Sequence, residues 1–485
     1  MGLLLGSGST TPQYPYSMWY GVQGDFTSQD YQLTRVGNLD LHRSLPIQKK
    51  LRRFVENTDG SVKYYLHAND SRKKDGGAAA TIDGSDGNVM LEKPEYYRRV
   101  EIWGTKWLYA ISEYELPGFT LMSRKTCSPW FASYNAAGDT AISGCFLTWN
   151  GDAIARDSND LPIFVSGAPR GGNDTNWDGT YRSLIGMPKT NVAKSAVRGK
   201  CKNGTHHGFG RIYNEIAWLQ RIEYASLYCQ DTFTETLTAD GFHQGGLGDG
   251  CTVDNTQWTN HNAHNPFVPC GVTATLGNNT GKVTFKVKNW QNSGTDKDIQ
   301  VTSYRGLETP FEYLNALADD LLVWHKADKS EIYVCEDRTK FTSHSDSATT
   351  VPNGYVAQTE LPRTSGYGLT LSLMQNGYSF IDKIGGAANK GVTDQFYTPI
   401  TSGFTDWGWY GALLGGNANN GANAGFGYLN TNNRSSNANA NIGFRLYRGY
   451  ILRKAKEIYI TVDPHNPTTQ GLLALLAAGK IIVIQ

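Results

Sequence analysis

Paired carboxylates are the first residues in this chain that could do chemistry. Glu113 and Glu115 lie close together, and Asp319 and Asp320 are adjacent. A glycosidase or depolymerase needs two carboxyl groups that face each other across a cleft. Carboxylates this close in sequence are usually solvated charges or members of one helix face, so we do not expect a glycosidase.

The sequence also contains few candidate residues for metal binding or nucleophilic catalysis. The close histidine pairs are His206 with His207 and His261 with His264, and no carboxylate stands at the spacing of a facial triad. P-loop, Gly-x-Ser-x-Gly, His-Glu-x-x-His and EF-hand patterns are absent from the sequence. The acidic loop 174–178 leaves calcium binding open as an alternative. We expect no enzyme, no resident cofactor and no metal site.

Binding chemistry has a stronger signal. Residues 417–441, here called the Asn-rich segment, hold ten asparagines among 25 residues, interleaved with Gly, Ala and Ser. A disordered linker is the simplest interpretation. Aromatic residues inside and beside the segment oppose it, because disordered tracts rarely carry their own hydrophobic anchors. We therefore expect ordered loops whose amides donate and accept hydrogen bonds without adding charge.

The elements that would position these loops follow from hydrophobic periodicity. Residues 62–66, 89–92 and 99–103 are short alternating runs between turn signals, which predicts hairpin strands. Residues 232–303 are rich in Gly, Asn and Thr and contain a strand-like run at 282–287, which predicts a β-rich insertion.

Two helices are expected around that insertion. Apolar residues at three- and four-residue steps predict a helix over residues 211–230. A second helix is expected over 310–324, with Pro310 in its first turn, where the missing N–H costs nothing.

Composition limits the classes of partner. The chain has 485 residues, a formal net charge of +1 and only 18% charged residues, with 54 Gly, 27 Tyr and 12 Trp. This balance is typical of a loop-rich, β-containing protein and argues against nucleic acid, which requires a basic field. No apolar run approaches the roughly 20 residues that span a bilayer, so no membrane insertion is expected. The seven cysteines lack C-x-x-C spacing and are expected as buried thiols, although Cys251 and Cys270 are the candidates if a disulfide forms.

Three segments resemble known proteins. GGNANNGANAGFGYLNTNNRSSNANANIGFRL (415–446) resembles the variable region of C-type-lectin-like proteins diversified by diversity-generating retroelements, which occur on phage tails and in bacteria. SYRGLETPFEYLNALADDLLV (303–323) resembles a turn and helix of the formylglycine-generating-enzyme-like branch of that fold, which shares the IGFR motif. RVGNLDLHRSLPIQKKLRR from Arg35, followed by DGNVMLEKPEYYRRVE, resembles a module of phages of gut Bacteroidetes.

The resemblance implies an α+β fold: a C-type-lectin-like/formylglycine-generating-enzyme-like domain with much irregular structure, plus a small N-terminal β-rich module and a β-rich insertion. The expected parts are an N-terminal arm (1–34), the β-rich module (35–115), the lectin-like domain (116–446, with variable loops at 407–441) and a C-terminal docking or oligomerisation extension (447–485). The extension departs from the family, whose domain ends soon after IGFR. The oxidase chemistry of the fold's namesake needs thiolates near that motif, and no cysteine follows Cys335.

The function implied is that of a receptor-binding protein in a phage virion, on the tail or fibre, which attaches to a bacterial surface glycan or protein. The alternative is a structural virion protein (fibre, decoration or adaptor) whose domain serves assembly only. Other virion proteins would bind at the termini, and a homo-oligomer such as a trimer is expected.

The expected receptor contacts are the aromatic and amide residues of the loops, together with one arginine. They are Trp407, Trp409, Tyr410, Asn417, Asn419, Asn420, Asn423, Phe426, Tyr428, Asn430, Asn432, Asn433 and Arg434. One exposed concave face would favour receptor binding over assembly, and alanine at Tyr428 and Asn432 is expected to abolish binding with little change in melting temperature. Gly443, Phe444 and Arg445 are expected to be scaffold, with Phe444 in the core and Arg445 bonded to loop backbone.

Overall fold

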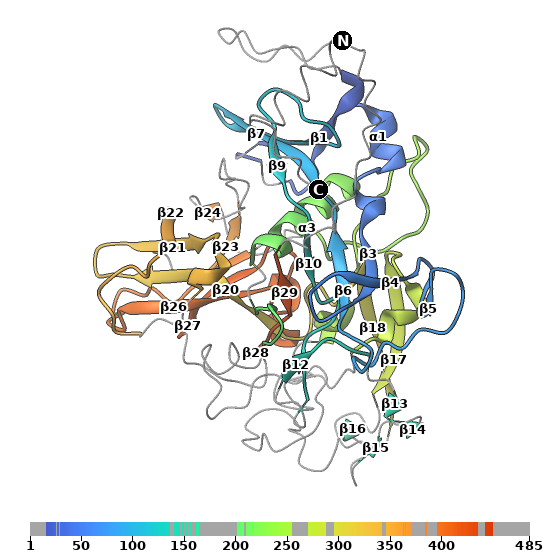
Figure 1. Ribbon diagram of the computed structural model, residues 1–485. Coiled ribbons are helices and arrows are strands. Elements are labelled where there is room, and N and C mark those ends of the chain that lie inside the picture. Colours follow the sequence, from blue (N-terminus) through green and yellow to red (C-terminus); the bar gives the residue numbers. More distant parts are fainter. Residues whose placement is uncertain are drawn as a thin grey trace, which may run out of the picture.

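The computed structural model is a β protein, and α+β is therefore the wrong class. It describes residues 16–25, 27–28, 30–135, 140–145, 148–149, 152–153, 155–156, 162–163, 201–207, 210–254, 270–287, 295–341, 346–361, 363, 365–370, 384–385, 395–434 and 442–449 (Figure 1). Strands account for 39% of the structure and helices for 14%. The α-helices in the described part are α1 (Leu39–Ser44) and α3 (Gly210–Tyr224).

A five-stranded antiparallel sheet has the order β2-β1-β8-β7-β9. Its strands are β1 (Tyr20–Asp25), β2 (Thr34–Gly37), β7 (Tyr96–Trp103), β8 (Lys106–Ser112) and β9 (Thr120–Met122). β1 pairs with both β2 and β8, so it is an inner strand. The expectation of an extended arm over 1–34 is therefore wrong from Tyr20 onward, while residues 1–15 lie outside the described part.

A six-stranded sheet, in the order β29-β10-β6-β3-β4-β5, joins distant parts of the chain. Its strands are β3 (Arg52–Glu56), β4 (Val62–His67), β5 (Asp70–Lys74), β6 (Val89–Lys93), β10 (Lys125–Cys127) and β29 (Tyr447–Arg448). The three alternating runs predicted from sequence are confirmed as β4, β6 and β7. Because β10 pairs with β6 on one side and β29 on the other, this sheet continues across the expected boundaries at 115 and 446.

The expected insertion is only partly β. Its strands belong to a three-stranded sheet of β17 (Gly281–Val287), β18 (Lys297–Tyr304) and β19 (Leu307–Glu308), which confirms the run at 282–287. The 3-10 helices η3 (Gly250–Asp254) and η4 (Val272–Leu276) precede them. Short two-stranded pairs lie before the insertion: β11 (Ser133–Asn135) with β12 (Thr140–Ile142), β13 (Thr148–Trp149) with β14 (Asp152–Ala153), and β15 (Ala155–Arg156) with β16 (Pro162–Ile163).

A nine-stranded sheet carries the Asn-rich segment and extends to the left of α3 in Figure 1. Its strand order is β22-β21-β20-β26-β27-β25-β23-β24, and β28 pairs with β20. The strands are β20 (Asn315–His325), β21 (Ser330–Cys335), β22 (Tyr355–Leu361), β23 (Gly366–Thr370), β24 (Ile384–Gly385), β25 (Gln395–Thr398), β26 (Gly408–Leu414), β27 (Leu429–Asn433) and β28 (Ile442–Gly443).

The helix expected over 310–324 is wrong, because β20 occupies most of that range. β20 is buried on both faces, so its apolar residues do not alternate with polar ones and the period of two is hidden. Its register against β26 also shifts between Ala318 and Leu322. Such a bulge adds residues to one strand, so the residues on either side of it do not keep a single alternation. The pattern of apolar residues was therefore a poor guide to this segment.

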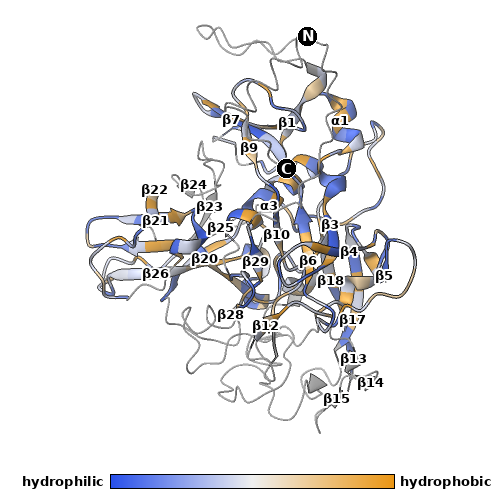
Figure 2. Ribbon diagram, viewed as in Figure 1, coloured by the Kyte–Doolittle hydropathy of each residue, from blue (hydrophilic) through white to orange (hydrophobic). Residues whose placement is uncertain are grey.

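The helix expected over 211–230 is confirmed as α3, although it ends at Tyr224. Ala225 follows in a left-handed conformation with φ 51°, which stops the helix. Every residue of α3 except Arg211 and Asn214 is buried, and Figure 2 shows hydrophilic as well as hydrophobic residues along it. Its charged side chains are therefore paired inside the protein: Glu215, for example, meets the Lys93 ammonium at 2.7 Å.

One hydrophobic core crosses the expected domain boundaries. Tyr109 of β8 stacks on Trp218 of α3 with ring centroids 4.2 Å apart, and both belong to the same buried cluster as Tyr410 of β26. The parts expected as separate units at 35–115 and 116–446 thus share their interior. The extension is described only to residue 449, and its expected strands and apolar helix lie outside the described residues.

Candidate functional site

The strands β26 and β27 place the predicted contact residues at two separate ends. Gly411 pairs with Asn433 and Leu414 with Leu429, and the loop 415–428 closes the pair at the Leu414 end. Trp407 precedes β26, at the opposite end. At about 3.4 Å per residue, a seven-residue strand separates the two ends by roughly 20 Å. The thirteen residues therefore do not form one concave face, the arrangement that would have favoured receptor binding over assembly.

Five of the thirteen are buried inside the protein. Their exposed fractions are 0% for Trp409, 2% for Tyr410, 4% for Asn417, 1% for Phe426 and 0% for Tyr428. Side chains buried to this degree cannot stack on a receptor, so the structure assigns them to the protein's own interior. They hold the loops in place, whereas they were expected to contact a receptor from the loop surface.

Cross-strand stacking explains the burial of Trp409. β20 and β26 pair Trp324 directly with Trp409, and the two rings stack with centroids 4.6 Å apart and planes 22° apart. Tyr333 of β21 meets the edge of Trp409 at 5.0 Å. The Lys326 ammonium lies 3.9 Å from the Trp324 ring centroid, which completes the stack. This aromatic ladder fixes the start of β26.

Aromatic contacts in the core also hold the end of the loop. Phe426 packs against Tyr213 and Tyr304, with ring centroids 5.0 and 5.9 Å apart, and its backbone N–H donates to Cys229 Sγ at 3.2 Å. Tyr428 is fully buried two residues later. The expectation that alanine at Tyr428 leaves the melting temperature unchanged is therefore reversed, because such a change would open a cavity.

Asparagines shape the first turn of the segment. The 3-10 helix η7 (Ala418–Asn423) begins with a capping box, in which Asn417 Oδ1 accepts from the Asn419 N–H at 3.1 Å and the Asn417 N–H donates to Asn420 Oδ1 at 2.7 Å. Asn419 is exposed, and Asn420 and Asn423 are half-buried. The amides thus build the turn as well as line it.

Asparagines also shape β27. Asn433 Nδ2 donates to Asn430 Oδ1 at 2.9 Å and to Asn432 Oδ1 at 2.7 Å, and the Asn432 N–H donates to Asn430 Oδ1 at 3.0 Å. The register shift between β26 and β27 gives β27 one residue more than its partner at this point. Asn432 is exposed there, while Asn430 and Asn433 are half-buried. The amide cluster is therefore rigid and partly accessible.

Arg434 fastens this cluster to the start of β26. Its guanidinium donates to the carbonyl oxygens of Asp406 at 2.9 Å, Trp407 at 3.3 Å and Trp409 at 3.0 Å, and it also pairs with the Asp406 carboxylate. The guanidinium lies 4.0 Å from the Tyr410 ring centroid. Arg434 was expected to bind a receptor, but its guanidinium donates instead to groups of its own chain.

Trp407 is the predicted aromatic residue that remains partly exposed. Phe404 meets its ring edge-on at 4.8 Å, and the Arg363 guanidinium lies 5.1 Å from its ring centroid. Arg363 is itself held by the carbonyl oxygens of Lys326 at 2.7 Å and Ala327 at 3.0 Å. We call Trp407, Asn432 and Asn433 the sheet-end site. They lie at the same end of the β26–β27 pair, where Arg434, the residue after Asn433, donates to the Trp407 carbonyl oxygen.

A buried histidine supports this end of the sheet. The two ring nitrogens of His325 bond to Ser330 Oγ at 2.8 Å and to the Thr431 carbonyl oxygen at 2.9 Å, which ties β20 to β27 across β26. Burial, with the positive charges of Arg363 and Arg434 nearby, lowers the pKa of His325 to about 4. The imidazole is therefore neutral at pH 7.

Sequence reasoning missed the residues that support the site. Trp324 ends the segment expected as a helix and His325 follows it, so their place in a strand opposite Trp409 and Gly408 was hidden. Phe404 could have been suspected from its position close to Trp407. Arg363 gave no signal, because its contacts join segments far apart in sequence.

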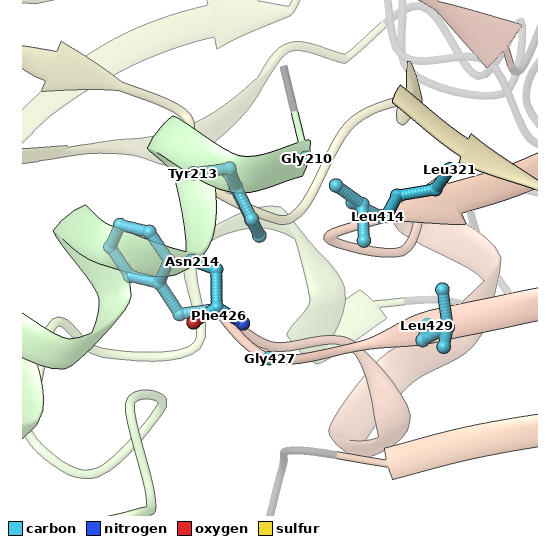
Figure 3. A pocket seen from close by; sticks show the side chains of 8 residues that line it. All are labelled: Gly210, Tyr213, Asn214, Leu321, Leu414, Phe426, Gly427 and Leu429. Carbon is cyan, nitrogen blue, oxygen red and sulfur yellow. The ribbon is translucent and has the colours of Figure 1, made fainter. Parts of the chain in front are cut away.

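A pocket opens at the other end of the pair, between the start of α3, β20 and the segment after η7 (Figure 3). Its lining residues are Gly210, Tyr213, Asn214, Leu321, Leu414, Phe426, Gly427 and Leu429. The Tyr213 hydroxyl donates to the Pro310 carbonyl oxygen at 2.6 Å and is thus engaged within the protein. No carboxyl, imidazole or amine group is among its lining residues, so the pocket offers no group for acid–base chemistry.

The carboxylate and histidine pairs do not form a catalytic cleft in the described residues. Asp320 is buried and accepts from the backbone N–H groups of Gly210 at 3.0 Å and Arg211 at 2.8 Å, so it caps α3. Burial raises the pKa of Asp320 to about 6. His207 Nε2 lies 3.5 Å from Asp319 Oδ1, and both side chains are fully buried. These groups are interior pairs, not the solvated helix-face charges expected for Asp319 and Asp320.

The other chemical candidates are surface groups or lie outside the described residues. Glu113 pairs with Lys50 at 2.5 Å, and Glu115 is exposed. Among the described residues, no group of three or more His, Cys, Asp and Glu side chains is placed to hold a metal ion. His261, His264 and loop 174–178 are outside the described part of the chain.

The cysteine expectation can be examined at Cys251 and Cys270. Cys251 Sγ donates to the Glu312 carbonyl oxygen at 3.3 Å, and Cys270 Sγ donates to that of Phe131 at 3.2 Å. Both are buried and not bonded to each other in this structure. Burial was expected for all seven cysteines, but Cys145 and Cys201 are only partly buried.

The expected scaffold role of the IGFR motif is confirmed. Phe444 is 7% exposed, and the buried Arg445 guanidinium donates to the carbonyl oxygens of Pro129 at 2.7 Å, Glu308 at 2.7 Å and Thr309 at 2.8 Å. A Cβ at Gly443 would approach the Phe131 ring to 2.7 Å, so glycine is required for this packing. The motif therefore fixes the chain that follows the Asn-rich segment against the protein core.

Comparison with known proteins adds no relative: no protein-family model and no curated protein matches this chain. Within the described residues, no helix has the length and apolar character needed to cross a membrane.

Proposed function

We propose that the protein is the receptor-binding protein of a phage virion, on the tail or fibre, and that it binds a bacterial surface glycan or protein through the sheet-end site. One observation carries the proposal: accessible indole and amide side chains are displayed on a backbone that Arg434 and the buried aromatic residues hold rigid. Rigid loops with adaptable polar side chains and a flat aromatic group suit recognition, because little entropy is lost on binding.

The division of labour inside the Asn-rich segment supports the same function. Tyr428 and Phe426 are buried and fix the loop, whereas Asn419 and Asn432 are exposed and contribute little to packing. Side chains of the second kind can be exchanged without loss of the fold, which is what a diversified binding surface requires. The assignment to phages and to retroelement diversification rests on the resemblance of residues 415–446.

The experiment is binding of the purified protein to a panel of intact gut Bacteroidales strains. The test variant carries Asn432→Ala and Asn433→Ala. The matched control carries Asn69→Ala and Asn279→Ala, an exposed amide pair joined at 3.1 Å beside β5 and η4. We expect saturable binding by the wild type and the control, and at least a tenfold weaker apparent affinity for the test variant, the factor that corresponds to about 1.4 kcal/mol.

Two outcomes would contradict the proposal. Equal binding by the test and control variants would place the receptor contacts elsewhere. No saturable binding by a cooperatively folded wild type to any strain would favour the alternative, a structural virion protein whose partners are other virion proteins.

A further inference from the structure

We propose that the ligand of the sheet-end site is an uncharged glycan, with the Trp407 indole as the surface on which a sugar ring stacks. This inference rests on the proposed function and narrows it from a glycan or protein to one class. Three observations around Trp407 support it: the cationic side chains are already engaged, the accessible groups are an amide and an indole, and no large hydrophobic residue of the described part of the chain is exposed there.

The cationic side chains at this end of the sheet are already engaged. Arg434 is paired with Asp406 and with backbone carbonyls, and Arg363 donates to the carbonyl oxygens of Lys326 and Ala327. At the turn between β20 and β21, Lys326 and Lys329 both pair with Glu331, at 2.8 and 2.7 Å. Lys329 also lies in the field of Asp328 and Glu360. The four cations are thus balanced by four carboxylates, Asp406 included, so an anionic ligand gains little net attraction here.

The groups that remain for recognition are the exposed Asn432 amide and the half-buried Trp407 indole. Asn433 Nδ2 is already used in hydrogen bonds to Asn430 and Asn432. An amide matches hydroxyl groups, since it offers both donors and an acceptor. An aromatic face packs against the apolar C–H face of a sugar ring, and the Phe404 and Arg363 contacts hold the Trp407 ring in one orientation before binding.

A protein receptor fits this surface less well. The centre of a protein–protein interface is apolar, and a stable interface buries about 800 Å² on each side. The large hydrophobic residues exposed in the described part of the chain are Leu39, Ile102, Tyr114, Leu121, Leu237, Val351 and Val356. None of them lies in β26, in β27 or in the residues 401–407 before β26, so the sheet-end site lacks such an apolar centre.

The test uses the wild-type protein and three variants on a strain that the wild type binds. The variants are Trp407→Ala, the conservative Trp407→Phe, and Tyr114→Ala as a control at an exposed aromatic residue outside the nine-stranded sheet. The probes are capsular polysaccharide from that strain, divided by anion exchange into neutral and acidic fractions, and cells treated with periodate or with proteinase K. Melting temperatures verify that each variant is folded.

We expect the neutral fraction to compete for cell binding and periodate, but not proteinase K, to abolish it. Trp407→Ala should weaken binding about tenfold and Trp407→Phe less than about threefold, in line with the value of an aromatic contact. An increase in NaCl from about 0.05 to 0.5 M should leave the Kd within about twofold, because screening acts on charge pairs.

Three results would overturn the inference. Loss of binding after proteinase K would identify a protein receptor, and competition by the acidic fraction alone with strong salt dependence would identify an anionic glycan. Wild-type affinity in a folded Trp407→Ala variant would remove the stacking role. In each of these cases the protein still binds cells, so the proposed function would stand while the glycan inference failed.

Discussion

Replacing Tyr428 with alanine should separate anchoring from display in the Asn-rich segment. Tyr428 is 0% exposed, and its hydroxyl accepts from Asn430 Nδ2 at 3.3 Å. Removal of a buried aromatic ring lowers the free energy of unfolding by roughly 3–5 kcal/mol, because packing is lost and a cavity remains. At about 2.1 cal/mol/K per residue, a cooperative unit of roughly 300 residues shifts its melting temperature by about 1.5 °C per kcal/mol, so a fall of roughly 4–8 °C is expected.

The matched change is Asn432→Ala at an exposed position of the same strand. Surface substitutions usually alter stability by less than about 0.5 kcal/mol, so its melting temperature should stay within about 1 °C of the wild type. Differential scanning calorimetry of the two variants gives the comparison. If Tyr428→Ala melted within 1 °C of the wild type, Tyr428 would not be a core residue, and the separation of anchors from displayed side chains would be wrong.

Two further predictions concern the support of the sheet-end site. The pKa of His325 is lowered to about 4, so between pH 6.5 and 4 the unfolded state binds more protons than the folded state. The contribution of neutral His325 to the free energy of unfolding is therefore present above pH 6.5 and is lost as the pH falls toward 4. The total loss is on the order of 3 kcal/mol. Urea titrations from pH 7 to 4 should show a shallower decline for His325→Gln, and an equal slope would contradict the assignment. Arg434→Lys should cost about 2 kcal/mol, because an ammonium cannot serve the carbonyl oxygens that the guanidinium serves, and limited proteolysis should then cut near Trp407 faster than in the wild type.

Local sequence signals predicted the regular elements well where the apolar residues recur at a clear period of a strand or a helix. The runs at 62–66, 89–92 and 99–103 alternate and are strands, and the helix over 211–230 was found because its apolar residues recur at helical steps. The order of the Asn-rich segment up to Arg434 was also correctly expected from the aromatic residues within it.

The same reasoning failed at β20, which is buried on both faces and whose register against β26 shifts part-way along the strand. β20 packs against separate clusters on its two sides, with Val323 in one and Leu322 in the other, so neither polarity nor period distinguished it from a helix. The α+β class followed from a resemblance that included this segment as a helix. Because the segment is a strand, that class is wrong as well. The expected arm failed for another reason: whether Tyr20 begins a free segment or an inner strand depends on β8, almost ninety residues away.

The sequence alone establishes that this protein carries a segment of uncharged amides interleaved with aromatic rings, which bring hydrogen-bonding groups and flat area wherever the chain places them. Only the tertiary structure decided which of these groups are available. Trp409 and Trp407 are two residues apart in the sequence, yet one stacks on Trp324 in the interior and the other remains partly accessible. Burial is set by the neighbours that strand pairing brings from distant parts of the chain, and local sequence contains no record of those neighbours.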